Sequence, residues 1–214
     1  NNPGFIAEDP ISIPHTFSKK EDIEIASFLV ATISWGQRPV ILRNGAWLMD
    51  LMEQQPHQFI LHSDKAAKKK LQRFVHRTFN GTDAFYFTGA LQRIYKEFGN
   101  LENLFFDKIR KSNDNMQQAI GSVREEFFKA GVPGRTGKHF SDPLSNSAAK
   151  RLNMMLRWLV RTDSRGVDFG IWKSINPSQL YCPLDVHSGR VARKLGLLKR
   201  KQDDWKAVDE LTIQ

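Results

Sequence analysis

The sequence predicts an all-α protein, and three observations support this fold class. Apolar residues recur at helical spacing, as at Ile25, Phe28, Leu29 and Ile33. Residues that cap or end helices punctuate the apolar runs. No segment shows the sustained apolar–polar alternation of strands, and no repeat or low-complexity tract is present. With 214 residues and 40% hydrophobic content, the chain is long enough for a real core, which we expect in one unit of two helical lobes.

The first two predicted helices lie in the N-terminal part of the chain. Ser18 and Glu21 match a capping box, with Ser18 as the N-cap of a helix that holds the first apolar run. Gly36 is expected to end this helix. Pro39 suits the first turn of the next helix, because proline fits positions whose N–H has no intrahelical partner.

The remaining helices follow in order, each with its own signal. A helix over 82–98 is closed by Gly99, and one over 115–130 has apolar residues at helical spacing. The segment 131–146 is rich in glycine and polar residues and is expected to be a loop. The clearest helix covers 147–161, a shorter one over 185–195 is closed by Gly196, and Asp203 or Asp204 caps the last.

The positive charge is concentrated in one stretch. The chain carries a formal charge of +9, whereas residues 127–201 alone carry 15 Lys or Arg and 4 Asp, a net charge of +11. A solvated basic face would explain this. The alternative is a phosphate-backbone partner, because Lys and Arg bind nucleic acid by releasing condensed counterions. We therefore treat 127–201 as the candidate functional segment.

Several classes of protein and site are excluded by composition. One cysteine, Cys182, permits no internal disulfide and no four-Cys zinc site or iron–sulfur cluster. The six histidines are dispersed, so we expect no metal or other cofactor. The longest nearly apolar run is about half of the ~20 residues that a membrane span needs. Without a signal-peptide pattern, a cytoplasmic monomer that contacts no membrane is predicted.

The most informative segment begins at Asp185. Interpreted as structure alone, Asp185 is a helix N-cap, Val191 and Leu195 face the core, and the arginines are solvated. The whole string, Asp185-Val-His187-Ser-Gly-Arg190-Val-Ala-Arg193-Lys-Leu-Gly196, is more specific than a cap. It resembles the signature of the helix-hairpin-helix DNA glycosylase superfamily. In that superfamily the first Asp is the catalytic carboxylate, in a cleft between two helical lobes.

Most of the chain is also similar to a bacterial family placed in this superfamily. The segments that carry this wider resemblance are 9–15, 81–87 and 147–158. The usual hairpin turn before the catalytic lysine is missing, because Gly131-Val-Pro-Gly134 lies too far upstream. In this respect the chain resembles the archaeal 8-oxoguanine glycosylases, which lack the hairpin.

The resemblance implies a catalytic lysine, for which Lys150 is the candidate. It lies 35 residues before Asp185, in the first turn of the predicted 147–161 helix. A helix N-terminus and the adjacent Arg151 both provide positive potential, which favours the neutral amine that a nucleophile requires. Helical spacing directs Lys150 away from Leu152 and Met155, which suits either a cleft or plain solvent.

Further residues are assigned to DNA contact. Trp35 is a candidate for stacking on an everted base, and Gln37 matches the superfamily's Leu-Ser-x-Gln motif except for one extra residue. The other candidates for DNA binding are Lys138, His139, Arg151, His187, Arg190 and Arg193. Tryptophan is more often a packing residue, and His187 is equally suited to a local hydrogen bond. Asp168 and Trp172 are expected to be structural.

Three functions remain open. The first is a base-excision DNA glycosylase with AP-lyase activity that acts on lesion-containing duplex DNA, such as an oxidised purine. The second is a protein of the same fold that binds DNA or RNA without chemistry. A third is a protein-interaction module with an acidic partner. The basic stretch fits each of them, so the discriminating observation is whether Lys150 and Asp185 face one another.

Overall fold

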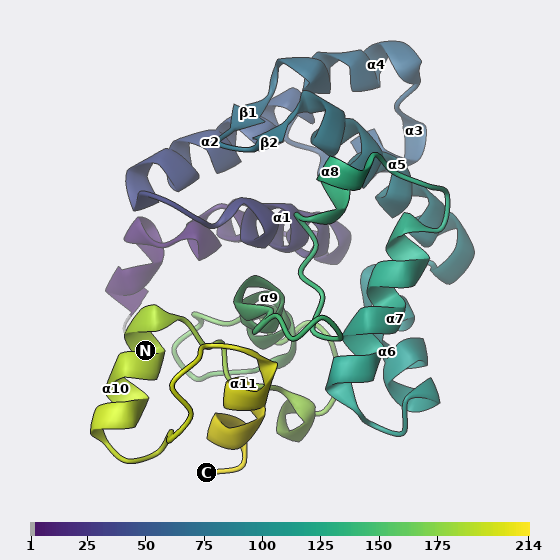
Figure 1. The fold of residues 1–214 in the computed structure, drawn as a ribbon. Helices are drawn as coiled ribbons and strands as arrows, with labels where there is room; N and C mark the ends of the chain where they lie inside the picture. Colours follow the sequence, from purple (N-terminus) through teal and green to yellow (C-terminus); the bar gives the residue numbers. More distant parts are fainter. Residues whose placement is uncertain (1–2) are drawn as a thin grey trace.

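The computed structural model describes residues 3–214, and they form a mostly helical protein (Figure 1). The predicted all-α class is therefore confirmed. The α-helices are α1 (Lys20–Ile33), α2 (Arg38–Leu51), α3 (Pro56–His62), α4 (Lys65–Lys69), α5 (Gly81–Phe98), α6 (Leu101–Lys111), α7 (Met116–Phe128), α8 (Gly134–Gly137), α9 (Lys150–Val160), α10 (Val186–Lys194) and α11 (Trp205–Thr212). Short 3₁₀ turns are η1 (Pro3–Glu8), η2 (Pro10–Ser12), η3 (Pro14–Thr16), η4 (Lys70–Arg73) and η5 (Pro177–Gln179).

Helix α1 is the central element of the fold. All its residues from Asp22 to Ile33 are buried, which is typical of a helix surrounded by other elements. It crosses the middle of Figure 1, with α2 to α5 above it and α9, α10 and α11 below. Helix α9 packs directly on α1, and one hydrophobic core includes residues from both sides of it.

The only strands in the described part of the chain are two strands of two residues each, which form a hairpin. β1 (Val75–His76) pairs antiparallel with β2 (Phe79–Asn80), so that His76 lies opposite Phe79. His76 and Phe79 are almost completely buried. The hairpin escapes prediction because two residues are too few to show alternation.

Most of the predicted helix ends agree with the structure. Gly99 follows α5 with φ of 84°, and Gly196 follows α10 with φ of 74°, the left-handed backbone that glycine adopts most readily. Asn115 caps α7 and Asp204 caps α11 through their side chains. Pro39 lies in the first turn of α2.

The predicted capping box at Ser18 is wrong. Helix α1 begins at Lys20, and its N-cap residue Lys19 makes no side-chain cap. Glu21 therefore lies within the first turn, where a carboxylate still interacts favourably with the helix dipole.

The interpretation of Val191 and Leu195 as core residues is also wrong. They are 56% and 67% exposed, whereas Gly189 and Ala192 are the buried residues of α10. Small residues face inward because the Asp203 carboxylate passes within 2.5 Å of the site that a Gly189 Cβ would occupy. The apolar spacing of α10 thus marks its outer face.

Candidate functional site

Lys150 is the first residue of α9, and the turn before it is braced by the start of α11. Ala149 has a left-handed backbone with φ of 45°, which a non-glycine residue seldom adopts. The Trp205 N–H donates to the Asn146 carbonyl at 3.2 Å, and Asp204 accepts from the Asn146 amide at 3.0 Å. The backbone that presents Lys150 is therefore held by contacts far along the chain.

The Lys150 side chain lies on the outside of its own helix, as the spacing predicts. Leu152 and Met155 face the core, whereas Lys150 Nζ lies 3.6 Å from the sulfur of Met154, one turn further on. Its charged partner, Asp185, lies 35 residues further along the sequence. Lys150 Nζ is 3.8 Å from Asp185 Oδ2, and the two side chains are 34% and 40% exposed.

Asp185 is the N-cap of α10, and each of its oxygens has a different role. Oδ1 accepts from the N–H groups of His187 and Ser188, both at 2.9 Å, and the Ser188 hydroxyl accepts from the Asp185 N–H. Oδ2 faces Lys150. Partial burial alone would raise the pKa of Asp185, but the Ser188 hydrogen bonds and the Lys150 cation outweigh it and lower that pKa. The carboxylate is thus ionised beside the amine.

The two residues line one pocket of about 300 Å³. Its wall brings together η2, the loop between α1 and α2, α9 and the start of α10. The other residues that line it are Asp9, Pro10, Ser34, Trp35, Gly36, Arg38, Ile41, Met154 and His187. This volume is at the lower end of the range for small-molecule sites and is sufficient for one nucleobase.

Trp35 reaches this pocket with part of its ring already covered. The Arg151 guanidinium lies over the indole at 4.9 Å, and His139 stacks on it at 5.8 Å with an interplanar angle of 25°. Arg151 also donates to the Thr32 carbonyl, and burial lowers its pKa. Arg151 therefore links Trp35 to α1. Its guanidinium is engaged in these contacts within the protein, whereas the sequence predicted a contact with DNA.

His139 is buried, so the prediction of a phosphate contact by its side chain is wrong. The residue is 4% exposed, and burial lowers its pKa despite the neighbouring Asp83 carboxylate. Its Nε2 lies 3.4 Å from Asp83 Oδ2. Asp83, which is fully buried, also accepts from the Thr136 hydroxyl at 2.7 Å and pairs with Arg135 at 3.0 Å. The sequence did not reveal this network, which fixes the 134–140 segment against α5.

The remaining predicted DNA contacts divide into exposed and engaged residues. Gln37, Lys138, His187 and Arg190 are exposed, and His187 also lines the pocket. Arg193 instead donates to the Arg200 carbonyl at 2.7 Å and pairs with Asp203 at 2.6 Å. Arg193 therefore holds the loop after α10 in place.

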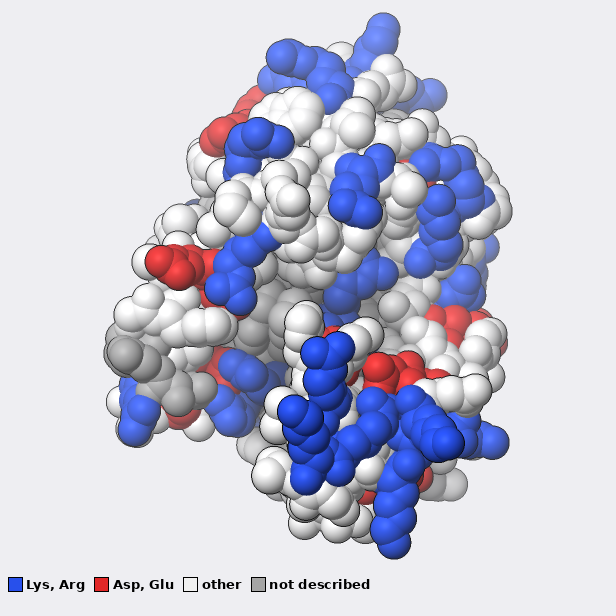
Figure 2. Space-filling view, turned by 60° about the vertical axis from the view of Figure 1, so that its left-hand side comes forward, with Lys and Arg blue, Asp and Glu red and all other residues white. Residues whose placement is uncertain are grey.

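The surface near the pocket is strongly basic. Figure 2 shows Lys and Arg side chains gathered densely on the lower part of the face, at the level of α10 and the loop that follows it. The exposed basic residues of this segment are Arg190, Lys194, Lys199 and Lys201. Within residues 3–214 no group of His, Cys, Asp and Glu could hold a metal. No described helix is both long enough and apolar enough to cross a membrane.

Sequence reasoning missed several residues of the pocket wall. Asp9 and Arg38 are polar, and Met154 contacts the amine of Lys150. The Asp9-Pro10 pair is a recognisable turn signal. Nothing local in the sequence places it beside residues 150 and 185, because the tertiary fold alone brings them together.

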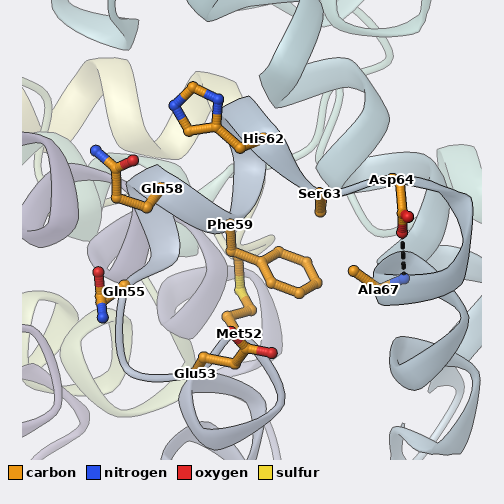
Figure 3. Close-up of a pocket in the computed structure, with 9 residues that line it drawn as sticks. All are labelled: Met52, Glu53, Gln55, Gln58, Phe59, His62, Ser63, Asp64 and Ala67. Carbon is orange, nitrogen blue, oxygen red and sulfur yellow. Dashed lines mark hydrogen bonds between the residues drawn. The ribbon is translucent and has the colours of Figure 1, made fainter.

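A second pocket, of about 400 Å³, lies among the end of α2, α3 and the start of α4 (Figure 3). The Phe59 ring points into it, next to Met52. Both of its carboxylates are engaged: Asp64 caps α4 by accepting from the Ala67 N–H at 2.7 Å, and Glu53 pairs with Lys70. Lys70 is not among the residues that line this pocket, whereas Lys150 and Asp185 both line theirs.

Comparison with known proteins gives a family but no activity. No curated protein and no solved structure matches the chain. A family model described as "Protein of unknown function (DUF2400)" matches residues 9–214. The match extends over the pocket from Asp9 to His187 and over all eleven α-helices. The chain belongs to the DUF2400 family.

Proposed function

We propose that the protein is a DNA glycosylase with AP-lyase activity that acts on a damaged base such as an oxidised purine. The observation that carries this proposal is the separation of 3.8 Å between Lys150 Nζ and Asp185 Oδ2 at the wall of one pocket. This proximity of two residues 35 positions apart supports the pairing of lysine and aspartate that the resemblance to helix-hairpin-helix glycosylases implies.

Lys150 is the nucleophile in this reaction. Its amine attacks C1′ of an everted nucleotide, the C1′–N bond breaks, and its electron pair leaves with the base, which takes up a proton. The C1′–O4′ bond of the sugar then opens, a proton moves from Nζ to O4′, and an imine forms between Nζ and C1′. β-Elimination transfers a C2′ proton to solvent, breaks the C3′–O bond and releases the 3′-side strand with its phosphate. Water then hydrolyses the imine and frees Lys150. The amine must lose its proton before attack. Only the neutral amine has the lone pair that this attack requires.

Asp185 stabilises the positive charge that develops on the sugar. A fixed anion near C1′ lowers the energy of the transition state more than that of the ground state. The lowered pKa of Asp185 keeps the carboxylate ionised at neutral pH. One oxygen holds the helix cap while the other faces the pocket, so the charge is held in place before the substrate arrives.

The basic surface supplies the DNA affinity. Residues 127–201 carry a net charge of +11 and include both catalytic candidates. Arg190 and Lys138 are exposed and can neutralise phosphates without interrupting a contact of the protein itself.

A nucleic-acid-binding protein without chemistry is the second candidate. It is favoured by one observation: the Lys150 side chain is one-third exposed and lies in an ion pair with Asp185, which is also the arrangement of an ordinary surface salt bridge.

Borohydride trapping distinguishes the two candidates. Duplexes that carry 8-oxoguanine, uracil or an abasic site are incubated with the protein and reduced, which converts an imine into a stable adduct. We expect an adduct with wild type and with Lys173→Gln, an exposed control on the same segment, and none with Lys150→Gln. Wild type that binds the duplexes but forms no adduct with any of them would support the binding protein instead.

A further inference from the structure

The pocket contains a second carboxylate that the proposed reaction does not use. Asp9 lines the pocket together with Lys150 and Asp185. Its Oδ1 accepts from the Ile11 N–H at 3.1 Å as the cap of η2. Its other oxygen, Oδ2, makes no hydrogen bond or ion pair within the described part of the chain, and the residue is half-buried. Oδ2 is thus available to a ligand.

Asp9 is held rigidly enough to serve as a recognition group. Its N–H donates to the Ile6 carbonyl at 3.1 Å, and its own carbonyl accepts from the Ser12 N–H at 2.9 Å. The next two residues, Pro10 and Ile11, are buried. A carboxylate fixed on both sides loses little conformational entropy when it binds a partner.

Asp9 and Ser34 offer hydrogen-bond acceptors at the pocket wall. The Ser34 hydroxyl already donates to the Val30 carbonyl at 2.7 Å, which leaves only its lone pairs for a ligand. Asp9 Oδ2 is an acceptor as well. Arg38 is exposed at the start of α2, where it is accessible to a phosphate at the rim, and Ile41 and Met154 supply apolar wall.

A base that matches these acceptors must present N–H donors side by side. The Watson–Crick edge of guanine does so, through N1–H and the N2 amino group, and guanines oxidised at C8 keep both. Uracil places its single N–H between two carbonyls, and adenine offers one amino group beside an acceptor nitrogen. Hydrogen bonds to a carboxylate are about twice as strong as neutral ones, so the donor pair of guanine is favoured.

We propose that Asp9 reads the N1–H and N2 amino donors of an everted guanine-type base and so determines which base enters the Lys150 pocket. This assignment rests on the proposed glycosylase function. Asp9 touches the base only, whereas Lys150 and Asp185 act on the sugar. Base selection and the lyase step are therefore separable by mutation.

The test compares Asp9→Asn with wild type on three duplexes, which carry 8-oxoguanine, uracil or a preformed abasic site. Asparagine keeps an acceptor for the Ile11 N–H but replaces the second oxygen with an amino group, which faces the donors of guanine. We expect 8-oxoguanine excision to fall about 100-fold, while cleavage of a preformed abasic site stays within about twofold because no base is read. Asp9→Ser, which keeps the cap and removes the second oxygen, should fall similarly. Glu8→Gln, an exposed neighbour, should match wild type.

Each outcome bears on one claim. Abasic-site cleavage by Asp9→Asn at the wild-type rate shows that the variant is folded. Unchanged 8-oxoguanine excision in that variant, or equal wild-type excision of 8-oxoguanine and uracil, overturns the role of Asp9 and leaves the glycosylase proposal standing. Absence of abasic-site cleavage by wild type overturns the glycosylase proposal, and the reading of the base by Asp9 with it.

Discussion

Asp185 and Glu24 are two carboxylates at helix N-termini, and their surroundings give them opposite properties. Asp185 caps α10 with one oxygen and directs the other to Lys150 at the pocket wall. Glu24, from the middle of α1, is fully buried at the start of α6. There it accepts from the Leu101 N–H at 2.8 Å and the Trp172 indole N–H at 2.7 Å, and further donors are Tyr95 and the Glu102 N–H.

Burial decides the difference in charge state. Desolvation is the largest influence on both groups and raises the pKa of Glu24 despite its four hydrogen bonds. In Asp185 the hydrogen bonds and Lys150 prevail, and the pKa is lowered. Both oxygens of Glu24 are enclosed by donors of the protein, whereas Asp185 Oδ2 faces Lys150 at the pocket wall. A carboxylate at a helix N-terminus is therefore a structural group when it is enclosed and a catalytic candidate when one oxygen is open.

The largest effect is expected from Asp185→Asn. Asparagine caps a helix as well as aspartate does, so the free energy of unfolding should change by less than about 1 kcal/mol. Removal of the anion should lower single-turnover excision by about 10³-fold, the scale of other electrostatic contributions to catalysis, with duplex affinity maintained. If duplex binding is lost together with folding stability, Asp185 is only a helix cap. Asp185 and Glu24 would then both be structural groups.

The opposite pattern is expected from Glu24→Ala. The change leaves the Trp172 indole N–H and the Tyr95 hydroxyl buried without their acceptor, so the free energy of unfolding should fall by about 3 kcal/mol or more. Urea denaturation measures it. Glu125→Ala, at an exposed position of α7, is the control and should stay within about 0.5 kcal/mol. An equally small change in both variants would contradict a structural role for Glu24.

The two carboxylates should also respond to pH with opposite signs. The lowered pKa of Asp185 contributes stability above the unfolded value of about 3.9, and this contribution is lost as the pH falls through the folded pKa. The raised pKa of Glu24 makes the folded state bind the proton more tightly, so stability falls as the pH rises from about 4.3 through the folded pKa.

Denaturation curves from pH 3 to 8 test this sign difference. Compared with wild type, Glu24→Gln should lack the loss of stability on raising the pH, and Asp185→Asn should lack the loss on lowering it. The Asp185 effect should remain below about 1 kcal/mol, because a side chain that is 40% exposed is screened by solvent. Slopes of the same sign in both comparisons would contradict the assigned environments.

The contrast between these two groups also explains what the sequence could predict. The Asp185 cap, the α10 helix and Gly196 are signalled within a dozen residues, and the direction of Lys150 follows from helical spacing. Glu24 gives no such signal, because its partner Trp172 is 148 residues away. Likewise, His139 and Arg151 appear as surface cations in a local view, but packing around Trp35 encloses them.

The smallest effects are expected at two arginines of α10, Arg190 and Arg193, which differ in the same way as the two carboxylates. Arg190 is exposed on α10, whereas Arg193 is engaged with Asp203 and the Arg200 carbonyl. We expect Arg190→Gln to weaken binding of any duplex a few-fold and to lower the slope of log K against log salt by about 1. Arg193→Gln should instead lower the free energy of unfolding by about 1 kcal/mol. Salt titrations of duplex affinity and urea denaturation of both variants measure these effects, and a reversed pattern would contradict the assignment.

The most direct test of the central claim is to locate the covalent adduct. Wild type is reduced with borohydride in the presence of an abasic duplex, digested with a protease and nucleases, and analysed by mass spectrometry. The account predicts a sugar remnant on Nζ of Lys150, with no modification of Lys138 and Lys173, two exposed lysines of the same basic segment. An adduct on another lysine, or spread over several surface lysines, would contradict the pairing of Lys150 with Asp185 as the catalytic centre.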